Sequence, residues 1–143
     1  MRQDTVHLLQ DCAAALEKNT AMIESVLPRV KDPDLRKHLR QGQRTQKQLL
    51  HTADALLRQN GCLFRSAGPL SAGMRQLQTD LRLRLGGDDT VAASLVSGGC
   101  DTGLRQLCRS RNRYIGADSS ATELAELVID ADANFSASLR TFL

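Results

Sequence analysis

Hydrophobic positions recur every three or four residues along four separate stretches of the chain. The first stretch covers about residues 4–27, where this spacing predicts an amphipathic helix with one buried face. The ring of Pro28 disfavours helical geometry at Leu27, so the helix should end there. Its predicted apolar stripe consists of Val6, Leu9, Ala13, Leu16, Thr20, Ile23 and Leu27.

A second helix is expected to begin at Asp32-Pro33, because aspartate can cap free amide groups and proline fits the first helical turn. It should end near Asn60-Gly61, where glycine can adopt the left-handed closing conformation. The short link makes this helix antiparallel to the first. Its stripe consists of Leu35, Leu39, Gly42, Gln46, Leu49, Ala53 and Leu56.

The middle of the chain mixes turn residues with apolar ones. Residues 61–70 are typical of a connecting loop, and a short amphipathic helix is predicted over 70–85, ending before Gly86-Gly87. This connection is long enough to cross a bundle, so the second and third long helices can run parallel. The leucine-rich side of the short helix carries Leu70, Met74, Leu77, Leu81 and Leu85.

The third long helix is predicted from Asp88 or Asp89 to about residue 115. Its apolar series is Ala92, Val96, Cys100, Leu104, Leu107 and Tyr114. Glycine inside a helix costs close to 1 kcal/mol relative to alanine, so a kink or a close contact between helices must explain the glycines here. They are Gly98, Gly99 and Gly103.

The last helix is expected to open at residues 118–120, with Ser120 and Glu123 in the register of a capping box. Its predicted stripe consists of Leu124, Leu127, Val128, Ala131, Phe135, Leu139 and Phe142.

Four long amphipathic helices predict an all-α fold, a four-helix bundle with a short extra helix in the long middle connection, as one domain over residues 1–143. Met22 and Ile129 fall outside their own stripes. Together with the short helix they predict a homo-oligomer, in its simplest form a two-fold dimer. The side chains expected in the interior are Leu16, Ile23, Leu49, Leu56, Leu107, Leu127 and Phe135.

Composition supports the helical interpretation. Aromatic residues make up only 3% of the 143 residues, which disfavours β-sandwiches and barrels. The net charge of +3 is too small to indicate a dedicated nucleic-acid or membrane protein. The four cysteines lack metal-knuckle or redox spacing, and no apolar run is long enough for a membrane span, so we expect a cytoplasmic protein with reduced thiols.

Three short runs carry a resemblance to a known family. They are Lys31-Asp32-Pro33-Asp34-Leu35-Arg36, Gly86-Gly87-Asp88-Asp89 and Gly99-Cys100-Asp101. In their order and spacing the chain resembles a bacterial ferritin-like family of unknown function. The resemblance implies a ferritin-like four-helix bundle. A glutamate commonly follows the glycine that Gly99 matches in that family, whereas this chain has Cys100.

A ferritin-like di-metal site needs a Glu-x-x-His motif on two of its helices. No glutamate of this chain is followed by histidine at that spacing, which argues strongly against such a site. The residues three positions after Glu17, Glu24, Glu123 and Glu126 are Thr20, Leu27, Glu126 and Ile129.

The first helix offers two weaker sets of metal ligands. Asp4, His7 and Asp11 share a face, but that face lies opposite the leucine stripe, so a solvated surface is the preferred interpretation. Glu17 and Glu24 flank the core edge of the same helix and can reach inward. They are the candidates for a degenerate carboxylate-bridged iron or manganese site.

The second helix carries the most polarised charge of the chain. Its cations fall on one face, away from the leucines: Arg36, Lys37, Arg40, Arg44 and Lys47. The third long helix is also basic near its end, and such runs can neutralise phosphates. No aromatic residues for base stacking lie among the cations. The alternative is a solvated face, partly matched by the acidic surface of the last helix in the same or a neighbouring molecule.

The missing catalytic spacings favour a non-catalytic protein over an enzyme, and no cofactor is expected. The sequence therefore predicts a cytoplasmic ferritin-like bundle that acts through self-association or contacts with other proteins. Two alternatives stay open: a degenerate iron- or manganese-binding protein or oxidase, and a nucleic-acid contact through the basic helix face.

Overall fold

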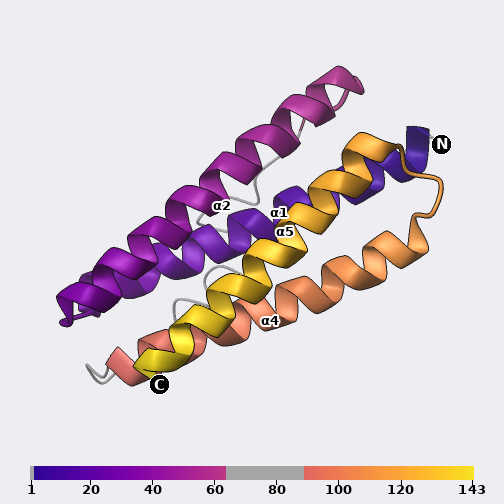
Figure 1. Ribbon diagram of the computed structural model, residues 1–143. Helices are drawn as coiled ribbons and strands as arrows, with labels where there is room; N and C mark the ends of the chain where they lie inside the picture. Colours follow the sequence, from indigo (N-terminus) through magenta and orange to yellow (C-terminus); the bar gives the residue numbers. More distant parts are fainter. Residues whose placement is uncertain (1, 64–88) are drawn as a thin grey trace.

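The computed structural model of the protein describes residues 2–63 and 89–143, and this part of the chain is helical without a strand (Figure 1). Short 3₁₀ turns, Leu27–Arg29 and Leu139–Phe142, follow the first and last helices. The four predicted long helices are confirmed, whereas the short helix expected over 70–85 lies outside the described residues. The helices are α1 (Arg2–Val26), α2 (Pro33–Gln59), α4 (Asp89–Arg113) and α5 (Ser119–Ser138).

Local signals set the helix ends much as the sequence predicts. The carboxylate of Asp32 accepts a hydrogen bond from the backbone N–H of Asp34 at 2.8 Å, so it caps α2. The end of α2 is followed by Gly61 with a φ of +74°. At the start of α5 the cap is Asp118, not Ser120: its carboxylate accepts from the N–H of Ala121 at 3.0 Å.

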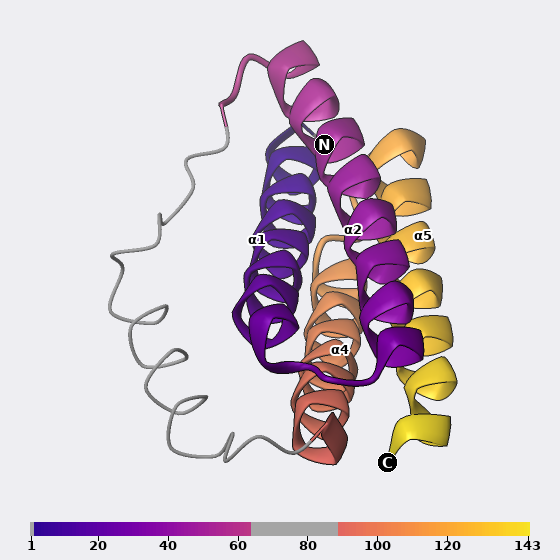
Figure 2. The same cartoon turned by 90° about the vertical axis from the view of Figure 1, so that its left-hand side faces the viewer.

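The helices form two antiparallel hairpins, α1–α2 and α4–α5, packed side by side as a bundle (Figure 2). The carboxylate of Asp89, the first residue of α4, accepts from the backbone N–H groups of Lys31 and Asp32 at 2.9 and 2.7 Å. The starts of α2 and α4 therefore lie at the same end of the bundle. This confirms that the second and third long helices run parallel.

The interior consists of two apolar clusters, one toward each end of the bundle. We name them after one leucine each. The Leu124 cluster contains Leu8, Leu9, Cys12, Ala13, Leu16, Ala53, Leu57, Leu107, Ala121, Leu124, Ala125 and Val128. The Leu39 cluster contains Met22, Ile23, Val26, Val30, Leu35, Leu39, Ala92, Ala93, Val96, Cys100 and Leu139.

Of the predicted interior residues, Leu16, Ile23 and Leu107 are fully buried, while three others are half-buried and pack against the clusters: Leu49, Leu56 and Phe135. The prediction for Leu127 is wrong, because its side chain is 56% exposed. The buried face of α5 is rotated from the predicted stripe toward Ala125 and Asp132.

The predicted association surfaces also need correction. Met22 is not a surface residue but belongs to the Leu39 cluster, and Ile129 is half-buried against the Leu124 cluster. Neither residue therefore offers an exposed apolar patch. The leucines of the expected short helix lie outside the described residues.

The glycines of α4 lie within one continuous helix. A Cβ atom at Gly103 would lie 3.7 Å from Nδ2 of Asn19, and one at Gly99 would lie 3.8 Å from Oδ1 of the same residue. Both are ordinary van der Waals distances, so α4 packs against α1 here, but a close helix contact does not by itself require glycine at either position. Gly98 faces open space, and no structural reason for it is visible.

Candidate functional site

A layer of polar side chains separates the two apolar clusters at the middle of the bundle. It consists of Asn19 from α1, Gln46 from α2 and Asp132 from α5, and it lies beside Gly103 of α4. Oδ1 of Asp132 accepts from Nε2 of Gln46 at 2.9 Å and from Nδ2 of Asn19 at 3.2 Å. All three side chains are buried, and Asp132 has no exposed surface. We call these three residues the central polar layer.

Burial dominates the electrostatics of this layer. Loss of solvation raises the pKa of the Asp132 carboxyl to about 6, although the hydrogen bonds from Gln46 and Asn19 act in the opposite direction. Two buried oxygens, Oδ2 of Asp132 and Oε1 of Gln46, have no hydrogen-bond partner in the described structure. A buried carboxyl group without a cation and with an orphaned oxygen is costly, so the layer needs a physical explanation.

Gln46 was predicted on a buried stripe, whereas Asn19 and Asp132 were not predicted as interior residues. The signal for both is their register: Asn19 lies between the buried Leu16 and Ile23, and Asp132 lies four residues after the buried Val128. A polar residue at a core position of an amphipathic helix is a candidate for a buried polar contact.

The buried cysteines do not add chemistry to the layer. Burial raises the pKa of the Cys12 and Cys100 thiols to about 12, so both are neutral at physiological pH. Cys62 and Cys108 are half-buried, and none of the four forms a disulfide. Reduced thiols at all four positions agree with the sequence prediction.

The structure does not bring the proposed metal ligands together. Glu24 is exposed and pairs with Lys47 of α2 at 3.7 Å, while Glu17 is half-buried on the same helix. Within residues 2–63 and 89–143, no group of three or more histidine, cysteine, aspartate or glutamate side chains is arranged to hold a metal ion. The expectation that Glu24 reaches inward is therefore wrong, because an ion pair directs it across the surface to α2.

The polar face of α1 has a structural role that its sequence did not reveal. Oδ2 of Asp4 accepts from the backbone N–H of Gly116 at 2.9 Å, and Oδ2 of Asp11 accepts from Oγ of Ser110 at 2.7 Å. These two carboxylates connect α1 to the end of α4 and the link to α5. The interpretation of this face as simply solvated is wrong for Asp4 and Asp11, whereas the His7 side chain is exposed.

The other two histidines belong to α2. Nε2 of His38 lies 2.5 Å from Oγ of Ser138, and its ring packs against Phe135 and Phe142. Because the Ser138 hydroxyl donates to the backbone carbonyl of Phe135 at 2.6 Å, His38 is the donor to that hydroxyl. His51 is exposed. Neither arrangement provides an activated nucleophile.

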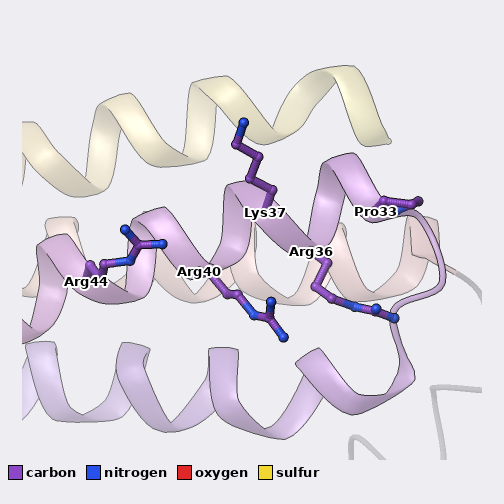
Figure 3. A pocket seen from close by; sticks show the side chains of 5 residues that line it. All are labelled: Pro33, Arg36, Lys37, Arg40 and Arg44. Atoms are coloured by element: carbon purple, nitrogen blue, oxygen red, sulfur yellow. The ribbon is translucent and has the colours of Figure 1, made fainter.

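The cations of α2 project from the face of the helix that looks away from the bundle. Arg36, Lys37, Arg40 and Arg44 line an open hollow of about 300 Å³ together with Pro33. Figure 3 shows Lys37 extending toward α5, while Arg36 and Arg40 extend toward α1. We call these four cations the α2 basic face.

Most of these charges are not used inside the protein. Arg36 donates to the backbone carbonyl of Val30. In the part of the chain that the structure describes, Lys37, Arg40 and Arg44 make no ion pair. The fifth predicted cation, Lys47, pairs with Glu24. Three neighbouring cations thus remain available to a ligand from outside.

No helix among the described residues has an apolar stretch long enough to cross a membrane. Comparisons of the chain with known protein families, with curated proteins and with solved structures give no match.

Proposed function

We propose that this protein is a non-catalytic, cytoplasmic helical bundle of ferritin-like topology that binds an acidic surface of a partner protein through the α2 basic face. The observation that carries this proposal is the set of three cations, Lys37, Arg40 and Arg44, which line one surface hollow without an ion pair among the described residues. The direction of the helices, with α2 and α4 parallel, supports the ferritin-like topology.

The pairing of charges elsewhere on the surface favours an external partner. The acidic residue Glu126 of α5 pairs with Arg111 of α4 at 2.8 Å, so it does not neutralise α2. Glu24 reaches only Lys47, which lies beyond the hollow. No acidic side chain among the described residues therefore forms an ion pair with Lys37, Arg40 or Arg44.

The side chains of this face also fit the chemistry of a carboxylate ligand. An arginine guanidinium presents a planar fork of donors that matches a carboxylate in a bidentate geometry. Arg40 and Arg44 lie one turn apart on α2, so acidic side chains one turn apart on a partner helix can meet both. A second copy of the chain also offers exposed carboxylates on α5: Glu123 and Asp130 lie about two turns apart, so either one can meet a cation of this face.

Binding of a labelled oligo-glutamate peptide tests the proposal, with a single-stranded oligonucleotide of the same charge as the second probe. We expect Arg40→Glu with Arg44→Glu to weaken peptide binding at least tenfold at low salt. The matched control, Arg105→Glu with Arg109→Glu on α4, changes the net charge equally at exposed positions and should leave the affinity within about twofold.

An equal loss in both double variants would show that only the overall charge matters, and the proposed site would be wrong. Tighter binding of the oligonucleotide, with a steep decrease as salt rises, would replace the protein partner by a nucleic acid. Sedimentation equilibrium tests whether the partner is a second copy of the chain. In that case the unmodified protein should have a mass above 15.6 kDa, and the double variant of Arg40 and Arg44 should have the mass of the monomer.

A further inference from the structure

The central polar layer joins the two helical hairpins of the bundle. Asn19 and Gln46 belong to the α1–α2 hairpin, and Asp132 belongs to the α4–α5 hairpin. Both hydrogen bonds of the layer cross from one hairpin to the other, and both end on the same carboxyl oxygen, Oδ1 of Asp132. The state of this one carboxyl group therefore affects how the two hairpins are held together.

The two orphaned oxygens of the layer are both acceptors if Asp132 is ionised. Oε1 of Gln46 and Oδ2 of Asp132 are each buried, and they belong to a pair of side chains already joined by the bond from Nε2 to Oδ1. A proton on Oδ2 turns that oxygen into a donor, and the Gln46 carbonyl is the acceptor it lacks. One proton thus satisfies both orphans in a paired carboxylic acid and amide.

We infer that the central polar layer is a proton-binding site, in which a neutral Asp132 pairs with the Gln46 amide and holds the α1–α2 hairpin against the α4–α5 hairpin. Loss of that proton leaves a buried carboxylate between the hairpins and weakens their contact. The bundle is therefore a switch whose ligand is the proton.

The surroundings of Asp132 favour the neutral acid. α1 and α2 offer it only the uncharged amides of Asn19 and Gln46. On α4, the carboxylate of Asp101 opposes a second negative charge, and the nearby Cys100 thiol is neutral. Gly103 brings the backbone of α4 close to Oδ2 without adding a polar side chain. No described cation therefore compensates for an ionised Asp132.

The direction of the pH effect follows from these facts. Because burial raises the pKa of Asp132 from 3.8 to about 6 in the folded protein, the folded state holds the proton more tightly than the unfolded chain. The stabilisation is complete below pH about 4 and is lost as the pH rises to about 6. A difference of about two pKa units corresponds to a change of about 100-fold in the folding equilibrium constant.

Asp132→Asn is the decisive variant, because asparagine has the shape of the neutral acid and carries a permanent donor where the acid carries its proton. We expect the unmodified protein to lose up to about 100-fold in its folding equilibrium constant between pH 4 and pH 7, relative to Asp132→Asn measured by urea unfolding. The matched control is Asp130→Asn, an exposed carboxylate on the same helix, which should keep the pH dependence of the unmodified protein.

A second measurement does not depend on a variant. Carbon-13 NMR of the aspartate carboxyl groups should give Asp132 a titration midpoint of about 6 in the folded protein. A midpoint below 4, or equal pH dependence in the unmodified protein and in Asp132→Asn, would overturn the inference. So would stabilisation of the unmodified protein by K⁺ or Mg²⁺ that disappears in Asp132→Asn, because the layer would then hold a cation.

Discussion

The two ends of the bundle are built from different side chains. The Leu124 cluster is rich in leucines, which come from α1, α2, α4 and α5. The Leu39 cluster has fewer leucines and relies more on valine, together with Met22 and Ile23, and Phe135 and Phe142 pack at its edge. The α2 basic face, with three cations that make no ion pair among the described residues, lies over the Leu39 end. At the Leu124 end, the charged groups Asp4 and Asp11 are instead engaged in hydrogen bonds between elements of the bundle.

The hydrogen bonds that connect the helices also differ between the two ends. At the Leu124 end, Asp4 and Asp11 of α1 bind groups at the end of α4 and in the link to α5. At the Leu39 end, a single carboxylate, Asp89, receives two backbone N–H groups from the link between α1 and α2. We infer that the two carboxylates of α1 secure the Leu124 end, whereas the Leu39 end combines a close fit around Phe135 with the surface available for binding.

The largest effect should come from the Leu124 end. Leu124→Ala removes a side chain that is 2% exposed, so it should lower the free energy of unfolding by about 2–5 kcal/mol through lost transfer energy and a residual cavity. Leu127→Ala, three residues along the same helix, removes an exposed side chain and should change stability by less than about 0.5 kcal/mol. Urea unfolding measures both. Equal losses would mean that the buried face of α5 is assigned wrongly.

An intermediate effect is expected where α2 meets Phe135 at the Leu39 end. A Cβ atom at Gly42 would lie 2.3 Å from Cζ of the Phe135 ring, so the ring must move if Gly42 becomes alanine. Overpacking of this kind costs about 1–3 kcal/mol, which exceeds the gain of about 1 kcal/mol in helix propensity.

Gly98→Ala is the matched control for this change, because a Cβ atom there meets nothing within 4 Å. It should stabilise the protein by up to about 1 kcal/mol in thermal or urea unfolding. Stabilisation by both substitutions would show that the Phe135 ring can move away at little cost and that the Leu39 end is not tightly packed.

The smallest effect on stability should come from the hydrogen bonds of Asp89 at the Leu39 end. The backbone N–H groups of Lys31 and Asp32 lower the pKa of Asp89, so its ionised form favours the folded state. This contribution is present above the pKa of the unfolded chain and is lost as the pH falls through the lowered value, which is the opposite sign to Asp132.

Asp89→Ala should therefore destabilise the protein slightly at neutral pH. In strong acid, where Asp89 is protonated, the variant and the unmodified protein should have the same stability. Hydrogen exchange at the first turns of α2 and α4 should report the loss locally, while the amides of the Leu124 end keep their protection. A uniform increase in exchange over both ends would contradict the separate roles assigned to them.

The four long helices and most of their ends could be predicted from local sequence patterns. Apolar spacing defines a helix locally, and Pro28, Asp32 and Gly61 act on the backbone within a residue or two of their own positions. The length of the connection between α2 and α4 also allowed their parallel course. The α2 basic face was predicted because its four cations share one side of a single helix.

The rotation of α5 and the central polar layer depend instead on contacts between helices. Asp132 interacts with residues 86 and 113 positions away in the sequence, so no local pattern shows that its hydrogen-bond partners reach it. Periodicity alone places Leu127 in the interior and Asp132 at the surface, because a polar residue at the edge of a stripe is usually assigned to the solvent. The physical reason is that burying a carboxyl group depends on the groups that meet it, and these come from other helices.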